Sequence, residues 1–330
     1  MGARFPTNRD SEVRFRKLPG QPPLSIVGQS QWVKSLSAQS PAGKLALAVI
    51  TEPERATPAP VGAGEEAMRF LLQTAADAGV HLIATRPDRD GERLLGQAWP
   101  FPSPFRVTVR TVPLSEGVDR VEARARRSLE RLGLPRGDVL LVSQASDLAG
   151  ADGRAMWDRL RGLKDRGLFR RIGFCTTMED GPALLARRYQ PDVVQIPCNL
   201  LDQRPVSEGV LSELAASGVD VHISSVFARG LLFTSSESLP PHLAPHALAL
   251  SRTRRRLAEA RVDPMQAALA FALGLPPAAA VIASVASAAE LRAILAAAHA
   301  PRPDLDWDAM ALTEPAAFAA APRLAVSNAA

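Results

Sequence analysis

Side chains able to do chemistry follow several short apolar runs of this sequence. The run VHLIA (80–84) leads into a charged loop that contains Arg86, Asp88, Arg89 and Asp90. Carboxylates beside guanidinium groups could bind a charged ligand, and a solvated surface loop is the alternative interpretation. Both interpretations stay open at the level of the sequence.

The two cysteines of the chain, Cys175 and Cys198, end or follow two later apolar runs. Thiols at the ends of neighbouring strands could form a redox pair, whereas buried cysteines more often only fill space. Two cysteines cannot form a disulfide framework, so we expect a cytoplasmic protein. Because no zinc-type ligand spacing occurs, we expect no metal.

Charge and hydropathy exclude several partner classes. The formal net charge is +5, and basic runs occur at 4–17 and 252–256 without interleaved aromatic residues. We therefore expect no nucleic-acid partner. No apolar run is long enough to span a bilayer, and the N-terminal residues lack the apolar block of a secretory signal, so we expect no membrane association.

Apolar runs alternate with amphipathic segments along most of the chain. The runs predict strands at 44–50, 80–84, 105–112, 138–143, 170–175, 192–197, 219–225 and 279–284, with helices between them and a last helix at 286–299. Eight strand–helix units in this order predict an α/β fold, a closed (β/α)8 TIM barrel. An open doubly wound sheet is the alternative, but no GxGxxG turn follows an early strand.

The pattern also divides the chain. Residues 1–43 show no sustained periodicity, and we interpret them as a basic, poorly ordered extension or cap. The barrel is predicted for 44–300, and an Ala/Pro-rich tail for 301–330. In such barrels the reactive groups stand where strands end. Here those positions include Arg86, Arg110, Thr111, Ser143, Cys175, Thr176, Gln195, Asn199, Ser224 and Ser284.

Four segments together resemble the aldo-keto reductase family. They are SLERLGLPRGDVLLV (128–142), WDRLRGLKDRGLFRRIGF (157–174), VVQIPCNLLDQR (193–204) and VHISSVFARGLLF (221–233). The last two are most similar to bacterial members found with carbohydrate-biosynthesis genes. The resemblance implies a (β/α)8 barrel that binds NADP(H) and reduces aldehydes, ketones or sugars.

The resemblance also implies a catalytic tetrad of aspartate, tyrosine, lysine and histidine. The tyrosine protonates the alkoxide that forms on hydride transfer, and an adjacent ammonium group lowers its pKa. At the matching positions this sequence has Ala84, Asp88 (or Arg89 beside it), Thr111 and Ser143, so none of the four residues is retained. The only tyrosine, Tyr189, lies far from these positions in the sequence.

Cofactor-binding positions are only partly kept. Gln195 and Asn199 match the segment in which the family binds the nicotinamide amide, and Cys175 and Thr176 replace its Ser-Asn pair. Ser224 stands at the position of the stacking tyrosine, with Phe227 as a substitute aromatic ring. Ser284 and Ser287 stand at the phosphate site, where a helix N-terminus could still bind an anion. We therefore expect weakened NADP(H) binding.

Two functional hypotheses follow from these residues. In the first, the barrel is catalytically degenerate and is retained to bind a sugar-like ligand or a protein partner, in bacterial carbohydrate biosynthesis. In the second, it is an NAD(P)H-dependent oxidoreductase that reduces a carbonyl or sugar with substitute groups such as Asp88, Arg110, Ser143 or Cys175.

Overall fold

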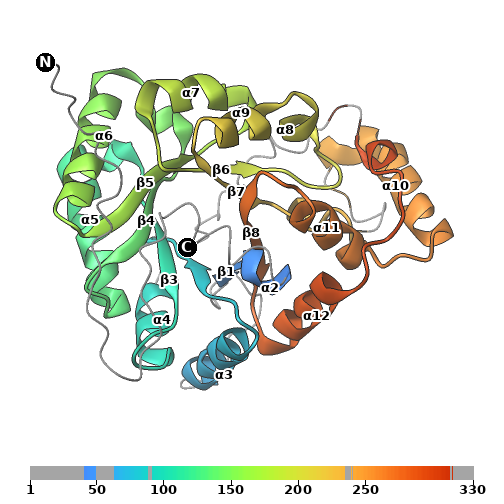
Figure 1. Cartoon of the computed structure of the whole chain (residues 1–330), viewed down its shortest axis with the longest axis horizontal. Helices are drawn as coiled ribbons and strands as arrows, with labels where there is room; N and C mark the ends of the chain where they lie inside the picture. The colour runs from blue at the N-terminus through green and yellow to red at the C-terminus, as the bar shows by residue number, and fades with distance from the viewer. Residues whose placement is uncertain are drawn as a thin grey trace, which may run out of the picture.

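A closed parallel barrel forms the centre of the molecule. The computed structural model describes residues 41–49, 63–87, 91–234, 239, 241–312 and 314. Within these ranges, eight strands pair in parallel in the order β1 to β8, and β8 closes onto β1. Helices surround the strands on the outside (Figure 1). The predicted (β/α)8 barrel is confirmed.

The bounds of the elements follow the predicted alternation closely. The strands are β1 (Leu45–Val49), β2 (Leu82–Ala84), β3 (Arg106–Arg110), β4 (Gly137–Val142), β5 (Phe169–Cys175), β6 (Val193–Pro197), β7 (Asp220–Ser224) and β8 (Ala278–Val285). The helices are α2 (Pro41–Lys44), α3 (Ala63–Asp77), α4 (Gly91–Ala98), α5 (Val118–Leu132), α6 (Gly150–Asp165), α7 (Pro182–Tyr189), α8 (Arg204–Ser207), α9 (Val210–Ala216), α10 (Ala247–Glu259), α11 (Pro264–Leu273) and α12 (Ala288–His299).

The interior of the barrel is filled by side chains. One apolar cluster contains Ala46, Leu82, Ala84, Ala280 and Ile282, and a second contains Val139, Leu141 and Val193. At the N-terminal ends of the strands, Arg171 bridges two carboxylates, with 2.6 Å to Asp138 and 2.5 Å to Asp220. Among the described residues, these ion pairs therefore lie at the end of the barrel opposite the C-terminal ends of the strands.

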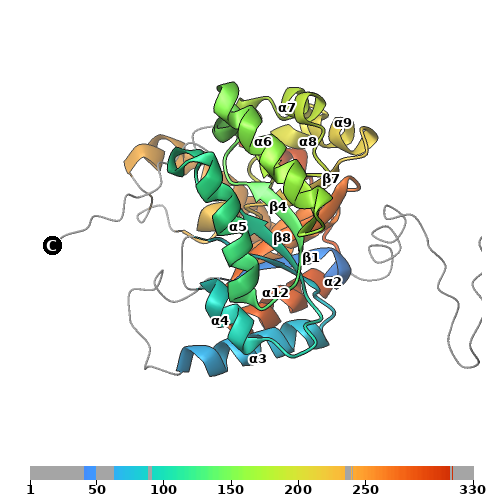
Figure 2. The same cartoon turned by 90° about the vertical axis from the view of Figure 1, so that its left-hand side faces the viewer.

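The outer helices pack side by side around the barrel. Figure 2 shows α3, α4, α5 and α6 along one side, in chain order. The closest approach is at Gly96 of α4, where an added Cβ atom would lie 2.2 Å from the carbonyl oxygen of Arg131 in α5. A glycine is therefore required at this crossing. No helix within the described ranges is long and apolar enough to cross a membrane.

The segment after α12 packs on the barrel. Met310 and Leu312 are buried, and the backbone N–H of Leu312 donates to the carbonyl of Leu201. The side chain of Gln203 donates to the carbonyl of Trp307 at 2.6 Å. The described part of the predicted tail therefore covers the barrel. Residues 1–40 of the predicted extension lie outside the described residues.

Candidate functional site

A large cleft opens at the C-terminal ends of the strands. Its volume is about 960 Å³, which is ample for a cofactor or a sugar. Residues at or just after the ends of all eight strands line it, together with the loop after β7. They include Arg86, Arg110, Ser143, Ser146, Cys175, Thr176, Asp180, Gln195, Ser224, Phe227, Arg229, Phe233 and Ser284.

The cleft brings together most of the residues that the sequence singled out. Seven of the predicted site residues line it: Ser143, Cys175, Thr176, Gln195, Ser224, Phe227 and Ser284. The other predicted positions lie elsewhere. Ala84 is part of an apolar cluster inside the barrel, and Asn199 lines a second cavity of about 50 Å³. Asp88, with Arg89 and Asp90, lies outside the described residues.

Thr111 and Ser143 are bonded to each other across the ends of β3 and β4. The backbone N–H of Ser143 donates to Thr111 Oγ1 at 3.2 Å, and Ser143 Oγ donates to the carbonyl oxygen of Thr111. Thr111 is 2 % exposed. The Thr111 hydroxyl thus accepts, and the Ser143 hydroxyl donates, a hydrogen bond that links the ends of β3 and β4.

Among the described residues that line the cleft, Gln195 has a buried polar atom without a hydrogen-bond partner. Its side chain is 3 % exposed, and its Oε1 atom accepts no hydrogen bond within the described protein. A buried amide oxygen without a donor costs about 1–3 kcal/mol. Because Gln195 lines the cleft, a bound molecule with an N–H or O–H group can supply that donor.

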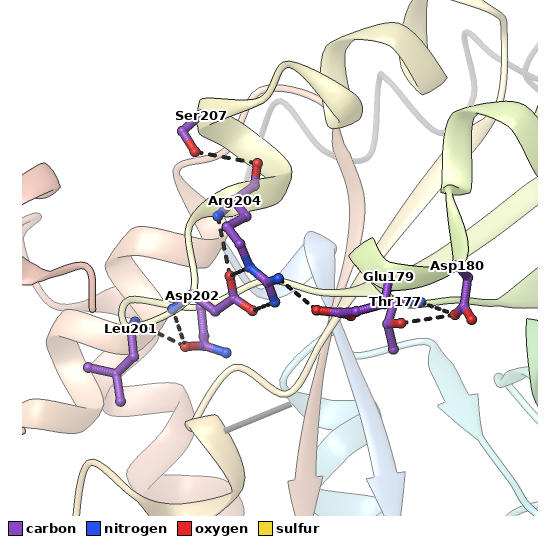
Figure 3. Close-up of polar contacts among 8 residues, drawn as sticks. Thr177, Glu179, Asp180, Leu201, Asp202, Arg204 and Ser207 are labelled. Carbon is purple, nitrogen blue, oxygen red and sulfur yellow. Dashed lines mark hydrogen bonds and ion pairs between the residues drawn. The ribbon is translucent and has the colours of Figure 1, made fainter. Parts of the chain in front are cut away.

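Asn199 has a structural role in the turn after β6. Its Oδ1 atom accepts the backbone N–H groups of Leu201 and Asp202, both at 3.0 Å. Arg204 then joins this turn to the loop after β5, with hydrogen bonds of 2.7 Å to Asp202 and 2.6 Å to Glu179 (Figure 3). These carboxylates raise the pKa of Arg204, whose fixed charge ties the two loops together at the cleft rim.

Two side chains of the same segment cap the N-terminus of α12. Ser287 Oγ accepts the N–H of Glu290 at 3.2 Å, and the Glu290 carboxylate accepts the N–H of Ala286 at 2.7 Å. This arrangement is close to a capping box. The positive end of the helix already faces a carboxylate, which would repel a phosphate group. The Ser-Ala-Ala-Glu spacing is the sequence signal that could have revealed this cap.

The loop after β7 adds residues that strand-end reasoning missed. Ser225, Ala228 and Arg229 all have a positive φ, at 57°, 47° and 55°. Three such non-glycine residues in one short segment store backbone strain beside the cleft. This conformation places Arg229 and Phe233 in the cleft wall. Such a loop has no periodic sequence pattern. Only its basic and aromatic residue types could have indicated from the sequence that it lines the cleft.

With this geometry established, the comparisons identify the family. A sequence model described as the Aldo/keto reductase family matches residues 105–312, which is more than half of the chain. The chain belongs to this family. No curated protein matches the sequence significantly.

Solved aldo-keto reductases share the fold of this chain. One from Bacillus halodurans, in its holo form, is 19% identical over 76% of this chain and 88% of its own, with a TM-score of 0.60. The aldose reductase of Giardia lamblia is 15% identical over 81% of this chain and 91% of its own, also with a TM-score of 0.60. At these identities the likeness shows the fold alone.

The two cysteines of the chain are both free thiols. Burial raises the pKa of Cys175, although the guanidinium groups of Arg110 and Arg86 oppose the rise. Burial raises the pKa of Cys198 to about 12, and the Asp202 carboxylate adds to it. Both thiols therefore stay protonated at neutral pH, which disfavours the proposed redox pair because the thiolate is the reactive form.

The single tyrosine of the chain lies outside the cleft. Tyr189 ends α7 and is 3 % exposed. Its hydroxyl donates to the carbonyl of Leu148, and its ring packs against Trp157 with 5.4 Å between centroids. Its phenol therefore serves the packing between helices and the loop after β4.

Proposed function

We propose that this barrel has lost the reductase reaction of its family and is retained to bind a small, sugar-like ligand in the cleft. The single observation that carries the proposal is the placement of Tyr189, whose phenol is bonded to Leu148 away from the cleft. Carbonyl reduction needs a positioned acid to protonate the new alkoxide. The cleft therefore lacks the phenol that the family resemblance requires.

The other described groups of the cleft do not replace that acid. Its ionisable side chains are arginines, Asp180 and Cys175. Guanidinium groups do not give up a proton in proteins, and the raised pKa makes Cys175 a poor acid. The Asp180 carboxylate accepts three hydrogen bonds from Thr176 and Thr177, so it is bound within its own loop.

The fit to NADP(H) differs between the two ends of the cofactor. The orphaned Oε1 atom of Gln195 suits the N–H group of the nicotinamide carboxamide, and Phe227 provides a ring beside it. At the phosphate end, Glu290 places a carboxylate on the N-terminus of α12. We propose that this unfavourable charge weakens NADP(H) binding without removing the nicotinamide pocket.

The ligand we propose is polar and sugar-like because several hydroxyl side chains line the cleft. They are Ser143, Ser146, Ser224, Ser225 and Ser284, together with Thr176 and Thr177. Those of Ser143, Thr176 and Thr177 already donate within the protein, and the others are the candidates for contact with the hydroxyl groups of a sugar. We also propose bacterial carbohydrate biosynthesis, in the cytoplasm, as the setting, on the resemblance of residues 193–204 and 221–233.

The second candidate is an NAD(P)H-dependent oxidoreductase with substitute catalytic groups. The observation that favours it is the buried, unpartnered oxygen of Gln195, which would hold a nicotinamide in the cleft. Bound NADPH would supply a hydride there. Arg110 is the described group of this hypothesis that could then polarise a carbonyl, since the Ser143 hydroxyl already donates to Thr111.

One titration and one assay separate these candidates. The full chain is titrated with NADPH by calorimetry and then incubated with NADPH and glyceraldehyde or glucose, while NADPH absorbance is followed. We expect weak or undetectable cofactor binding and no enzyme-dependent loss of NADPH. Micromolar binding together with substrate reduction that Gln195→Ala abolishes would instead support the oxidoreductase.

A further inference from the structure

Arg110 is the cation of the cleft that matters for a ligand. Among the described residues that line the cleft, the charged side chains are Arg86, Arg110, Arg229 and Asp180, and Arg86 and Arg229 already interact with other groups of the protein. A guanidinium in a cleft with low-dielectric walls attracts a negatively charged group. Arg110 therefore favours a negatively charged molecule over a neutral one of the same shape.

The Asp180 carboxylate is hydrogen-bonded within its own loop. Its Oδ2 atom accepts the backbone N–H of Thr177 at 2.7 Å, Thr177 Oγ1 at 3.0 Å and Thr176 Oγ1 at 3.3 Å. These bonds form a capping box that fixes the turn after β5. The carboxylate is thus turned to its own loop, and Figure 3 shows it beside Thr177.

Arg110 has a defined position because it belongs to a barrel strand. It is the last residue of β3, and its Cα pairs with Leu141, whose side chain belongs to an interior cluster. Residues paired in parallel strands point to the same face, so Arg110 is directed into the mouth of the barrel. Its charge acts on the thiol of Cys175, and Cys175 in turn pairs with Gln195 in register.

The cleft therefore offers two different contacts near one another. Arg110 offers a fixed cation with several N–H donors, and Gln195 offers a buried oxygen that needs a donor. A molecule that satisfies both must carry an anionic group and also a hydroxyl or amide N–H group.

We propose that the cleft binds a hydroxyl-bearing organic anion, a sugar acid or a sugar phosphate, with Arg110 on the charged group and Gln195 Oε1 accepting from a hydroxyl. This inference rests on the proposed function and names its ligand class. Carboxylate and phosphate share the chemistry that Arg110 recognises, and the probes below distinguish them.

The test compares three probes of matched size on the full chain by calorimetry: glucose, gluconate and glucose 6-phosphate. We expect at least one of the two anions to bind about tenfold more tightly than glucose, because a charge-assisted pair with a guanidinium is worth about 1.4 kcal/mol or more. The tighter anion identifies the charged group. Comparable affinity for all three, or no binding of either anion at millimolar concentration, overturns the proposal.

Three variants locate the site. Arg110→Gln should remove the preference for the anion, and Arg110→Lys should retain most of it. Gln195→Leu should weaken the anion and glucose alike, because it removes the hydroxyl acceptor. The matched control is Arg136→Gln, an exposed arginine just before β4 at the opposite end of the barrel, which should leave binding unchanged. Unchanged preference in Arg110→Gln, with its unfolding transition intact, also overturns the proposal.

Failure of this inference is distinguishable from failure of the proposed function. The reduction assay with NADPH decides whether the barrel is a reductase, and it requires neither anion. A cleft that binds gluconate or glucose 6-phosphate and also reduces glyceraldehyde would retain the inference and reject the loss of catalysis. A cleft that binds glucose as tightly as either anion, and reduces nothing, would reject the inference alone.

Discussion

Ser143 and Thr111 hold the ends of β4 and β3 together through two hydrogen bonds of opposite direction. The Ser143 N–H donates to Thr111 Oγ1, and the Ser143 hydroxyl donates to the Thr111 carbonyl. The family resemblance gives these positions to a histidine and a lysine. Here two small hydroxyl side chains close the strand ends instead, and we infer that they contribute to stability where the family uses them for chemistry.

Removing the hydroxyl of Thr111 should therefore destabilise the barrel. Thr111→Val keeps the shape of the side chain but leaves the Ser143 N–H without its acceptor, and we expect a loss of about 1 kcal/mol in the free energy of unfolding. Urea unfolding followed by circular dichroism measures it. Thr74→Val on the surface of α3 is the control and should change stability by less than about 0.5 kcal/mol. An equal effect of both variants would contradict the structural role.

The crossing of α4 and α5 should not tolerate a methyl group. In Gly96→Ala the new Cβ would meet the Arg131 carbonyl at 2.2 Å and the Leu132 Cα at 2.9 Å. Backbone atoms on both sides must then shift, which typically costs about 1–3 kcal/mol. Gly162→Ala in the interior of α6, where only a flexible arginine end lies within 4 Å, should instead stabilise by about 0.5–1 kcal/mol. The sign of the difference in melting temperature tests the packing directly.

His222 should make the fold sensitive to acid. Burial first, and then the charges of Arg171 and Arg106, lower its pKa from 6.5 to about 3, although Asp138 opposes them. Since the unfolded chain takes up the proton first, stability falls as the pH drops from 6.5 towards 3, with a slope of at most about 1.4 kcal/mol per pH unit from this group.

Replacement of His222 tests that slope. We expect His222→Gln to lose less stability than the wild type between pH 6.5 and 3, as measured by urea unfolding at a series of pH values. The exposed His299 of α12 provides the matched substitution, His299→Gln, which should leave the profile unchanged. Parallel profiles for the wild type and His222→Gln would show that the buried imidazole does not contribute.

The barrel could be predicted from sequence because its signals are local and repeat. Each strand is a short apolar run, and the positive-φ glycines at 79, 133, 167 and 218 follow helices that precede strands. The cleft residues at strand ends followed from the same alternation, because parallel strands bring all their C-terminal ends to one face. Thus Cys175, Gln195 and Ser224 were predicted together without any knowledge of their contacts.

Interactions of the site residues were much harder to predict. Asn199 matched a binding segment, yet its oxygen is used by the turn that it begins. The strained loop that brings Arg229 to the cleft has no periodicity, and its conformation depends on the packing around it. Residue types at strand ends thus indicate where a site lies, but hydrogen-bond partners decide which atoms remain for a ligand.

The carboxylate that caps α12 leads to a prediction about the affinity for NADPH. If the Glu290 carboxylate repels a phosphate at this helix N-terminus, Glu290→Gln should bind NADPH more tightly than the wild type, by about threefold to tenfold, since one charge near a helix end is worth about 0.5–1.5 kcal/mol. The amide can still accept from the Ala286 N–H, so the helix cap is preserved. Calorimetric titration with NADPH measures the change, and raised salt should reduce it. Glu130→Gln, an exposed charge in the last turn of α5, should have no effect. Unchanged NADPH affinity in Glu290→Gln would show that this carboxylate does not weaken cofactor binding.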